Sequence, residues 1–188
     1  MNTTPDLSLD ADLGARLDRI ESELAIRQLP ARYALAVDSR DLDTVVGLFV
    51  ADVNNGSNGI GRPALLSWFR EILSSFHRSV HFISGHVIDF ADADHATGSV
   101  YCRAEHEDGD KWVVMGFRYR DRYRREGGAW FFEQRRLQPW YVCDALERPN
   151  DGPFSRWPGR EESIPMMLPE AFPTWEPFWA NDAQTAGG

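Results

Sequence analysis

The chain has 188 residues, of which 43% are hydrophobic and 26% charged, and its formal net charge is -9. This length is typical of one domain, and so acidic a chain lacks the basic surface that a nucleic-acid partner requires. There is no apolar run of about 18 residues, so we expect no membrane span, and the N-terminus lacks the apolar stretch of a secretory signal. We therefore expect a cytoplasmic protein in which the two cysteines are ordinary buried thiols.

The first part of the chain predicts helices. Residues 1–12 are polar and are expected to be flexible. From Leu13 onward, apolar residues recur at steps of three and four, which is typical of a helix. They form two stripes, Leu13, Leu17, Ile20 and Leu24, followed by Ile26, Leu29, Tyr33 and Val37. Because Pro30 interrupts this pattern, we expect a kink or a break there.

Two shorter helices follow. Asp41 is expected to cap a second helix that runs to Phe49. Residues 54–61 contain three glycines and three asparagines and predict an irregular loop. A third helix is expected to begin at Gly61, because Pro63 suits the first helical turn.

The middle of the chain predicts an antiparallel sheet. Residues 80–90, 96–106, 112–124 and 129–137 are rich in β-branched and aromatic side chains, and turns are expected at 92–94 and at Gly127-Gly128. Helices first and strands later indicate an α+β fold, with a curved antiparallel sheet wrapped around the helices. We expect this domain to span residues 13–145.

The last segment, residues 146–188, has a different composition. Seven of the eleven prolines lie between Pro149 and Pro177, interleaved with aromatic residues. Because disordered tails are poor in aromatic residues, we expect an arm that packs either over the mouth of a pocket or onto a neighbouring subunit.

Asp38 and His81 are the main candidates for chemistry, because both fall in apolar surroundings. Alternation along the strand places His81, Ile83, Gly85 and Val87 on one face and His86 on the other. If the first face lines a pocket, His81 could serve as a general base and Asp38 could orient it. A capping aspartate and a structural histidine are the ordinary alternative.

Cofactor and metal chemistry find little support in the sequence. The histidines nearest to one another, His77, His81 and His86, do not share one face in this interpretation, so we expect no metal site. No phosphate-binding loop and no Gly-x-Ser-x-Gly motif is present, so we expect no cofactor. Of Arg135 and Arg136, alternation turns one inward, where it could polarise a substrate or form an ion pair.

Several segments, taken in order, resemble SnoaL-like proteins of the nuclear transport factor 2-like superfamily. They are YALAVDSRDLDT (33–44), LFVAD (48–52), GRPALL (61–66), the His81 strand and FRYRDRYRREGGAWFFEQRR (117–136). The resemblance covers residues 15 to 142 and implies a cone-shaped sheet with a pocket inside.

The resemblance also implies site residues. Family members of the scytalone dehydratase and hexachlorocyclohexane dehydrochlorinase type use an Asp–His pair that matches Asp38 and His81, and an arginine that matches Arg135. Tyr33 stands where the dehydrochlorinase has lysine, and we count it as a fourth catalytic candidate. The expected substrate-binding residues are Phe49, Asn54, Trp68, Phe69, Gly85, Tyr101, Met115 and Tyr119. Many relatives carry Asn where this chain has Gly85, which indicates a larger pocket.

These expectations converge on a cofactor-independent lyase or isomerase. It would act on a small hydrophobic or aromatic substrate by a dehydratase-type elimination or a retro-aldol-like cleavage. The alternative is a ligand-binding or scaffold protein, or the small subunit of an aromatic-ring dioxygenase. The exposed back of the sheet leads us to expect a homodimer or homotrimer, with no nucleic-acid or membrane partner.

Overall fold

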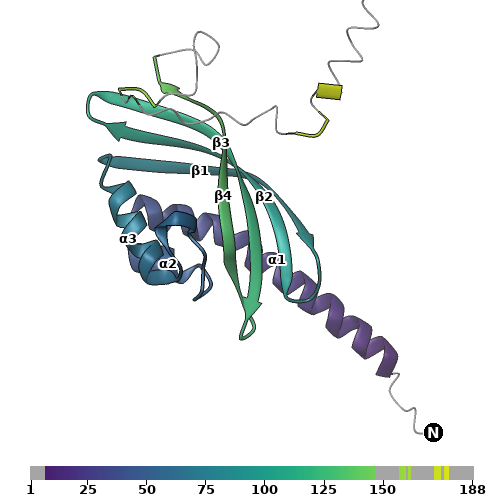
Figure 1. Cartoon of the computed structure of the whole chain (residues 1–188). Coiled ribbons are helices and arrows are strands. Elements are labelled where there is room, and N and C mark those ends of the chain that lie inside the picture. The colour runs from purple at the N-terminus through teal and green to yellow at the C-terminus, as the bar shows by residue number, and fades with distance from the viewer. Residues whose placement is uncertain (1–6, 147–156, 160, 162–171, 175, 178–188) are drawn as a thin grey trace, which may run out of the picture.

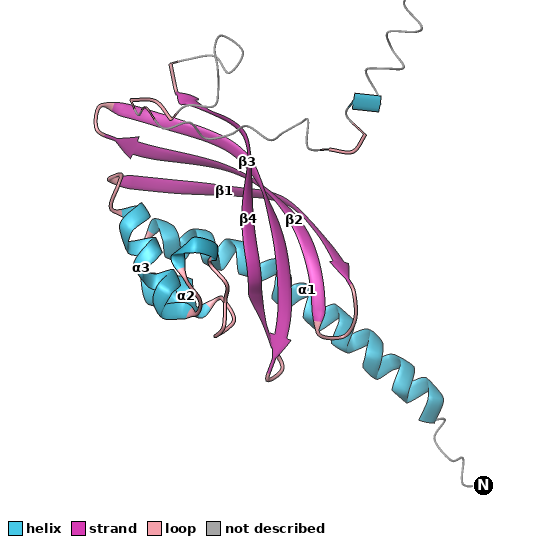
Figure 2. Ribbon diagram, in the orientation of Figure 1, coloured by secondary structure: helices cyan, strands magenta, loops and turns pink. Residues whose placement is uncertain are grey.

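The computed structural model describes residues 7–146, 157–159, 161, 172–174 and 176–177. Its elements are α1 (Leu7–Asp38), α2 (Leu42–Gly47), the 3-10 helix η1 (Gly56–Asn58), α3 (Arg62–Leu73), β1 (Arg78–Phe90), β2 (His95–Asp108), β3 (Lys111–Glu126) and β4 (Ala129–Asp144). The four strands form one antiparallel sheet in the order β1-β2-β3-β4. The sheet curves over the helices, which lie on its concave face (Figure 1 and Figure 2). The predicted α+β fold is confirmed, and no helix among the described residues has the length and apolar character needed to cross a membrane.

Helix α1 is continuous, so of the two outcomes predicted at Pro30, a kink or a break, the break is wrong. Pro30 lacks the N–H that would donate to the Ile26 carbonyl, which normally destabilises a helix. However, Ile26, Leu29, Tyr33 and Val37 are all buried on one face, before and after Pro30. Packing on both sides of Pro30 thus holds the two halves in one helix, which also begins earlier than expected, at Leu7.

The predicted cap of α2, the first turn of α3 and the hairpin are confirmed, although α2 ends at Gly47 rather than at Phe49 and α3 begins at Arg62. The Asp41 carboxylate accepts a hydrogen bond from the Thr44 backbone N–H at 3.1 Å and caps α2. Pro63 lies in the first turn of α3. Gly127 and Gly128 both have positive φ, 57° and 83°, as the tight turn between β3 and β4 requires.

A bulge in β1 changes which side chains face the interior. Ile83 pairs with Cys102 and His86 with Val100, so β1 has one residue more than β2 between these pairs. Alternation therefore changes phase at Ser84-Gly85. His86 shares the concave face with His81, and the predicted placement of His86 on the opposite face is wrong.

The C-terminal arm lies largely outside the described residues, but two of its aromatic residues are placed. Trp157 packs against Phe76 and His106, and its indole N–H donates to Asp108 at 2.8 Å. Phe172 lies beneath the Arg118 guanidinium. Both contacts are with the chain's own domain.

Candidate functional site

Asp38 and His81 form a hydrogen-bonded pair where the end of α1 meets β1. The His81 Nδ1 lies 2.7 Å from one Asp38 oxygen. The other Asp38 oxygen accepts the His81 backbone N–H at 2.9 Å, and the Ser79 hydroxyl donates to the first oxygen at 3.0 Å. Three donors thus fix the carboxylate, and the carboxylate fixes the imidazole ring.

The end of α1 is held in place by Arg40. This residue has a positive φ of 62°, which turns the chain out of the helix. Its guanidinium donates to the Val37 carbonyl at 2.9 Å and to the Ser79 hydroxyl at 2.8 Å. Arg40 and Ser79 therefore anchor Asp38 to β1, a role that the sequence did not reveal.

The protonation of the pair follows from these contacts. Burial raises the pKa of the Asp38 carboxyl, but the hydrogen bonds from His81 and Ser79 outweigh burial and hold that pKa below its ordinary value. An ionised Asp38 selects the tautomer in which Nδ1 carries the proton. The Nε2 lone pair of His81 is then available to accept a proton.

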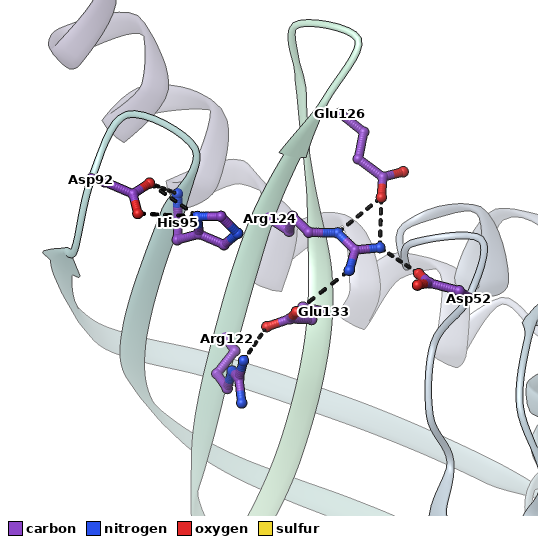
Figure 3. Close-up of polar contacts among 7 residues, drawn as sticks. All are labelled: Asp52, Asp92, His95, Arg122, Arg124, Glu126 and Glu133. Carbon is purple, nitrogen blue, oxygen red and sulfur yellow. Dashed lines mark hydrogen bonds and ion pairs between the residues drawn. The ribbon is translucent and has the colours of Figure 1, made fainter.

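A second Asp–His pair shows how much burial matters. His95 and Asp92 lie 3.0 Å apart on the turn between β1 and β2, close to the ion pairs of Arg124 (Figure 3). Their side chains are 51% and 59% exposed, against 8% for His81 and 23% for Asp38. Only the Asp38–His81 pair is shielded from water, so the His95–Asp92 pair is a natural control.

His106 lies next to His81, with a distance of 6.0 Å between the ring centroids. Burial between Phe76 and Trp157 lowers the pKa of His106 to about 4, so its ring is neutral near pH 7. His106 was not among the predicted site residues. Alternation would have found it, because it shares a strand face with Val100, Cys102 and Ala104.

Arg135 is the charged residue that faces the interior from β4, whereas Arg136 is exposed. The Arg135 side chain is only 4% exposed, and its guanidinium binds both oxygens of the fully buried Asp121, at 2.9 and 2.7 Å. The rings of Tyr33, Tyr119 and Phe132 pack against it. Its third nitrogen, Nη1, is buried without a hydrogen-bond partner among the described residues.

A chain of hydrogen bonds continues from Asp121. The Tyr123 hydroxyl donates to Asp121 at 2.9 Å and lies 3.0 Å from His86 Nε2. Because the hydroxyl proton is used, His86 Nε2 must be the donor in the second contact. Burial lowers the pKa of His86 to about 4, so His86 is neutral and the Asp121–Arg135 pair remains the charged centre of this chain.

A cavity of about 370 Å³ opens beside Arg135. Its lining contains seven of the predicted site residues, Tyr33, Phe49, Asn54, Trp68, Phe69, Tyr119 and Arg135. Met115 is buried in the core, and Gly85 and Tyr101 are exposed on the sheet, so these three lie away from the cavity. Asp38 and His81 are not among its lining residues either.

Cys102 is a buried residue of β2 whose thiol is affected by charges from both groups of residues. Burial raises the pKa of its thiol to about 12; the Arg135 guanidinium acts to lower that pKa and the Asp38 carboxylate acts to raise it. The two charged groups are therefore within electrostatic reach of the same buried atom. Within the described part of the chain, no three His, Cys, Asp or Glu side chains gather closely enough to hold a metal ion.

Comparison with known proteins identifies the family of the chain. A family described as SnoaL-like domain matches residues 18–136. Among curated proteins, the γ-hexachlorocyclohexane dehydrochlorinase of Sphingobium indicum is 26% identical over 126 residues, which cover 63% of this chain and 81% of the relative.

Solved structures share the fold. A putative scytalone dehydratase from Novosphingobium aromaticivorans superimposes with a TM-score of 0.60 at 23% identity, over 77% of this chain and 98% of the other. The hexachlorocyclohexane dehydrochlorinase of type 3 from Novosphingobium barchaimii gives a TM-score of 0.63 at 20% identity, over 73% and 99%. These similarities show that the chain shares the fold of these structures, with a curved antiparallel sheet and helices on its concave face (Figure 1).

Proposed function

Because the chain belongs to the SnoaL-like domain family, we propose that it is a cofactor-independent lyase that eliminates a leaving group from a small, largely apolar substrate. The observation that carries this proposal is the 2.7 Å contact between Asp38 and His81 Nδ1. It gives a shielded imidazole with a fixed tautomer, which is what a general base needs near neutral pH.

In the proposed reaction, His81 Nε2 removes a proton from a substrate carbon. The electron pair of that C–H bond forms a double bond to the neighbouring carbon, and the leaving group departs with the electrons of its own bond. The Asp38 carboxylate stabilises the imidazolium that forms. Solvent then removes the proton from His81 and completes the cycle.

Arg135 is proposed to stabilise the negative charge on the leaving group or on a substrate oxygen. Its Nη1 is the one guanidinium nitrogen that Asp121 does not bind, and Arg135 lines the apolar cavity. A donor held in a site with little water stabilises developing charge more strongly than water would. Tyr33 packs against the guanidinium and is proposed to position it rather than to react, since burial raises the pKa of its hydroxyl.

Two probes test the proposal, γ-hexachlorocyclohexane with chloride release as the readout, and a cyclic β-hydroxyketone with formation of the conjugated enone. We expect turnover of at least one, and His81→Ala is expected to lower kcat by about 10²- to 10⁴-fold. His95→Ala, at the exposed Asp–His pair, is the matched control and should retain the wild-type rate. Equal rates for His81→Ala and the wild type, or turnover of neither probe, would contradict the proposal.

A further inference from the structure

Helix α1 carries a second apolar face that the fold does not use. Leu13, Leu17, Ile20 and Leu24 follow one another at steps of four, three and four residues, and their side chains are 51% to 59% exposed. At 100° per residue they lie on one line along the helix, and Leu35, 73% exposed, lies on the same line. We call these five residues the outer stripe.

The outer stripe points directly away from the domain. The residues of α1 that pack against the domain, among them Ser22, Ile26 and Leu29, lie about 180° from it around the helix axis. Two contacts fix the rotation of the helix: Asp18 forms an ion pair with Arg125 at 2.8 Å, and Arg19 lies over the Phe90 ring at 3.5 Å. The stripe therefore cannot turn inward without breaking both.

The position of α1 leaves the outer stripe accessible. The N-terminal end of the helix extends beyond the edge of the sheet (Figure 1), and the contacts of Asp18 and Arg19 with the domain lie on the side away from the stripe. From Leu13 to Leu35 the stripe spans roughly 33 Å at 1.5 Å per residue. The four side chains from Leu13 to Leu24 form an unbroken exposed apolar row, while Arg27 and Gln28 lie between Leu24 and Leu35. An exposed apolar row of this kind marks an interaction site.

The pattern of the stripe specifies its partner. Steps of four and three residues form the seam of a two-stranded coiled coil, in which each helix offers the other the same row of side chains. Arg16 and Glu21 flank the seam on opposite sides. In a parallel pairing, each Arg16 would face Glu21 of the second copy, the arrangement of opposite charges that stabilises such pairs.

We propose that the outer stripe of α1 binds the outer stripe of a second copy of this chain, side by side and in parallel. Because each helix carries its own domain on the face opposite the seam, the two domains lie on opposite sides of the helix pair and do not collide. The inference concerns a surface remote from Asp38 and His81, and it does not depend on the proposed activity.

The test measures the molar mass of the full chain by light scattering during gel filtration. The wild type is expected to have the mass of an assembly, and the Leu17→Glu/Ile20→Glu variant is expected to dissociate it. Dimerisation should weaken on the order of a hundredfold or more, because carboxylates replace the apolar side chains at the centre of the seam. Ile60→Glu, at a residue that is 70% exposed but lies in a loop, should leave the mass unchanged. Circular dichroism should show that all variants remain folded.

A cross-link provides a second, independent measurement. An Ile20→Cys variant should form a disulfide-linked dimer on mild oxidation, since parallel seams bring equal positions together, while the native Cys102 and Cys143 are buried. A monomeric wild type, an unchanged mass in the double variant, or dissociation by Val87→Glu on the outer sheet face instead would overturn the proposal.

Discussion

At the scale of single residues, Arg135 is the side chain that the interior can least easily accommodate. A buried guanidinium is tolerated when a carboxylate pairs with it and the remaining hydrogen-bonding groups are satisfied. Asp121 supplies both of its oxygens, and Tyr123 in turn donates to Asp121. Stability and the proposed chemistry thus depend on the same Asp121–Arg135 pair, because the Asp121 carboxylate that compensates the charge of Arg135 also fixes the position of its Nη1.

Asp121→Asn should lower the free energy of unfolding by about 3 to 5 kcal/mol, because it leaves the Arg135 charge buried without a counter-ion. Urea denaturation would measure this. Asp121→Leu combined with Arg135→Met should be less destabilised than Asp121→Leu alone, since the double variant removes the unpaired charge. A loss below about 1 kcal/mol for Asp121→Asn would mean that the guanidinium finds another partner.

The sequence predicted some of these residues and missed others for identifiable reasons. Asp38 and His81 could be named because apolar neighbours and a family resemblance both singled them out. Counting alternate residues along β4 could not show that Arg135 faces the interior, because β4 shifts register against β3 near Gly116 and again near Arg122. Asp121 was not among the predicted site residues, although alternation along β3 places it on the interior face with Tyr119 and Tyr123.

At the scale of elements, the bulge in β1 decides which side chains form the interior. Up to Ile83 the odd-numbered residues of β1 face the interior, and from His86 onward the even-numbered residues do. Ser84 and Gly85 lie in an ordinary-looking strand sequence, so alternation alone predicted the wrong face for His86. Pro30 shows the opposite effect, since a strong local signal for a break was overruled by packing along the whole helix.

Deleting Gly85 should remove the bulge and leave the interior face of β1 intact. With Ser84 alone opposite Tyr101, Ile83 and His86 become alternate residues of a regular strand, so His86, Ile88 and Phe90 stay on the concave face. We therefore expect a loss of no more than about 1 kcal/mol in urea denaturation.

Gly85→Ala is the control. A Cβ at this position would meet no atom within 4 Å, so the substitution should change the free energy of unfolding by less than about 0.5 kcal/mol. A loss of several kcal/mol on deletion of Gly85 would contradict this prediction and would mean that the bulge itself stabilises β1.

At the scale of the whole molecule, the interior holds two neutral histidines at separate places. His86 belongs to the Arg135 group, and His106 lies under Trp157 next to His81. For each, burial lowers the pKa from 6.5 to about 4. In the unfolded chain both rings would titrate near their ordinary value, so folding is coupled to keeping them unprotonated.

The free energy of unfolding should therefore be constant between about pH 7 and pH 8 and fall as the pH is lowered from 6.5 toward 4. The sign follows because the unfolded state binds more protons than the folded state in this window. Below it, carboxyls whose pKa is lowered in the folded protein, such as Asp38, add to the loss. For His106 alone the shift corresponds to on the order of 3 kcal/mol between pH 7 and pH 4.

Urea denaturation at pH 7.5, 6 and 5 would measure the slope of the free energy of unfolding against pH. His106→Gln should flatten this slope without abolishing it, because His86 still titrates.

Trp157→Ala should also flatten the slope, by a different route. It removes the indole that covers His106, so the pKa of His106 should rise toward 6.5 and the folded state should bind a proton that it now excludes. An NMR titration of the His106 ring would report this directly, and an unchanged pKa in Trp157→Ala would show that the sheet and Phe76 alone keep His106 neutral.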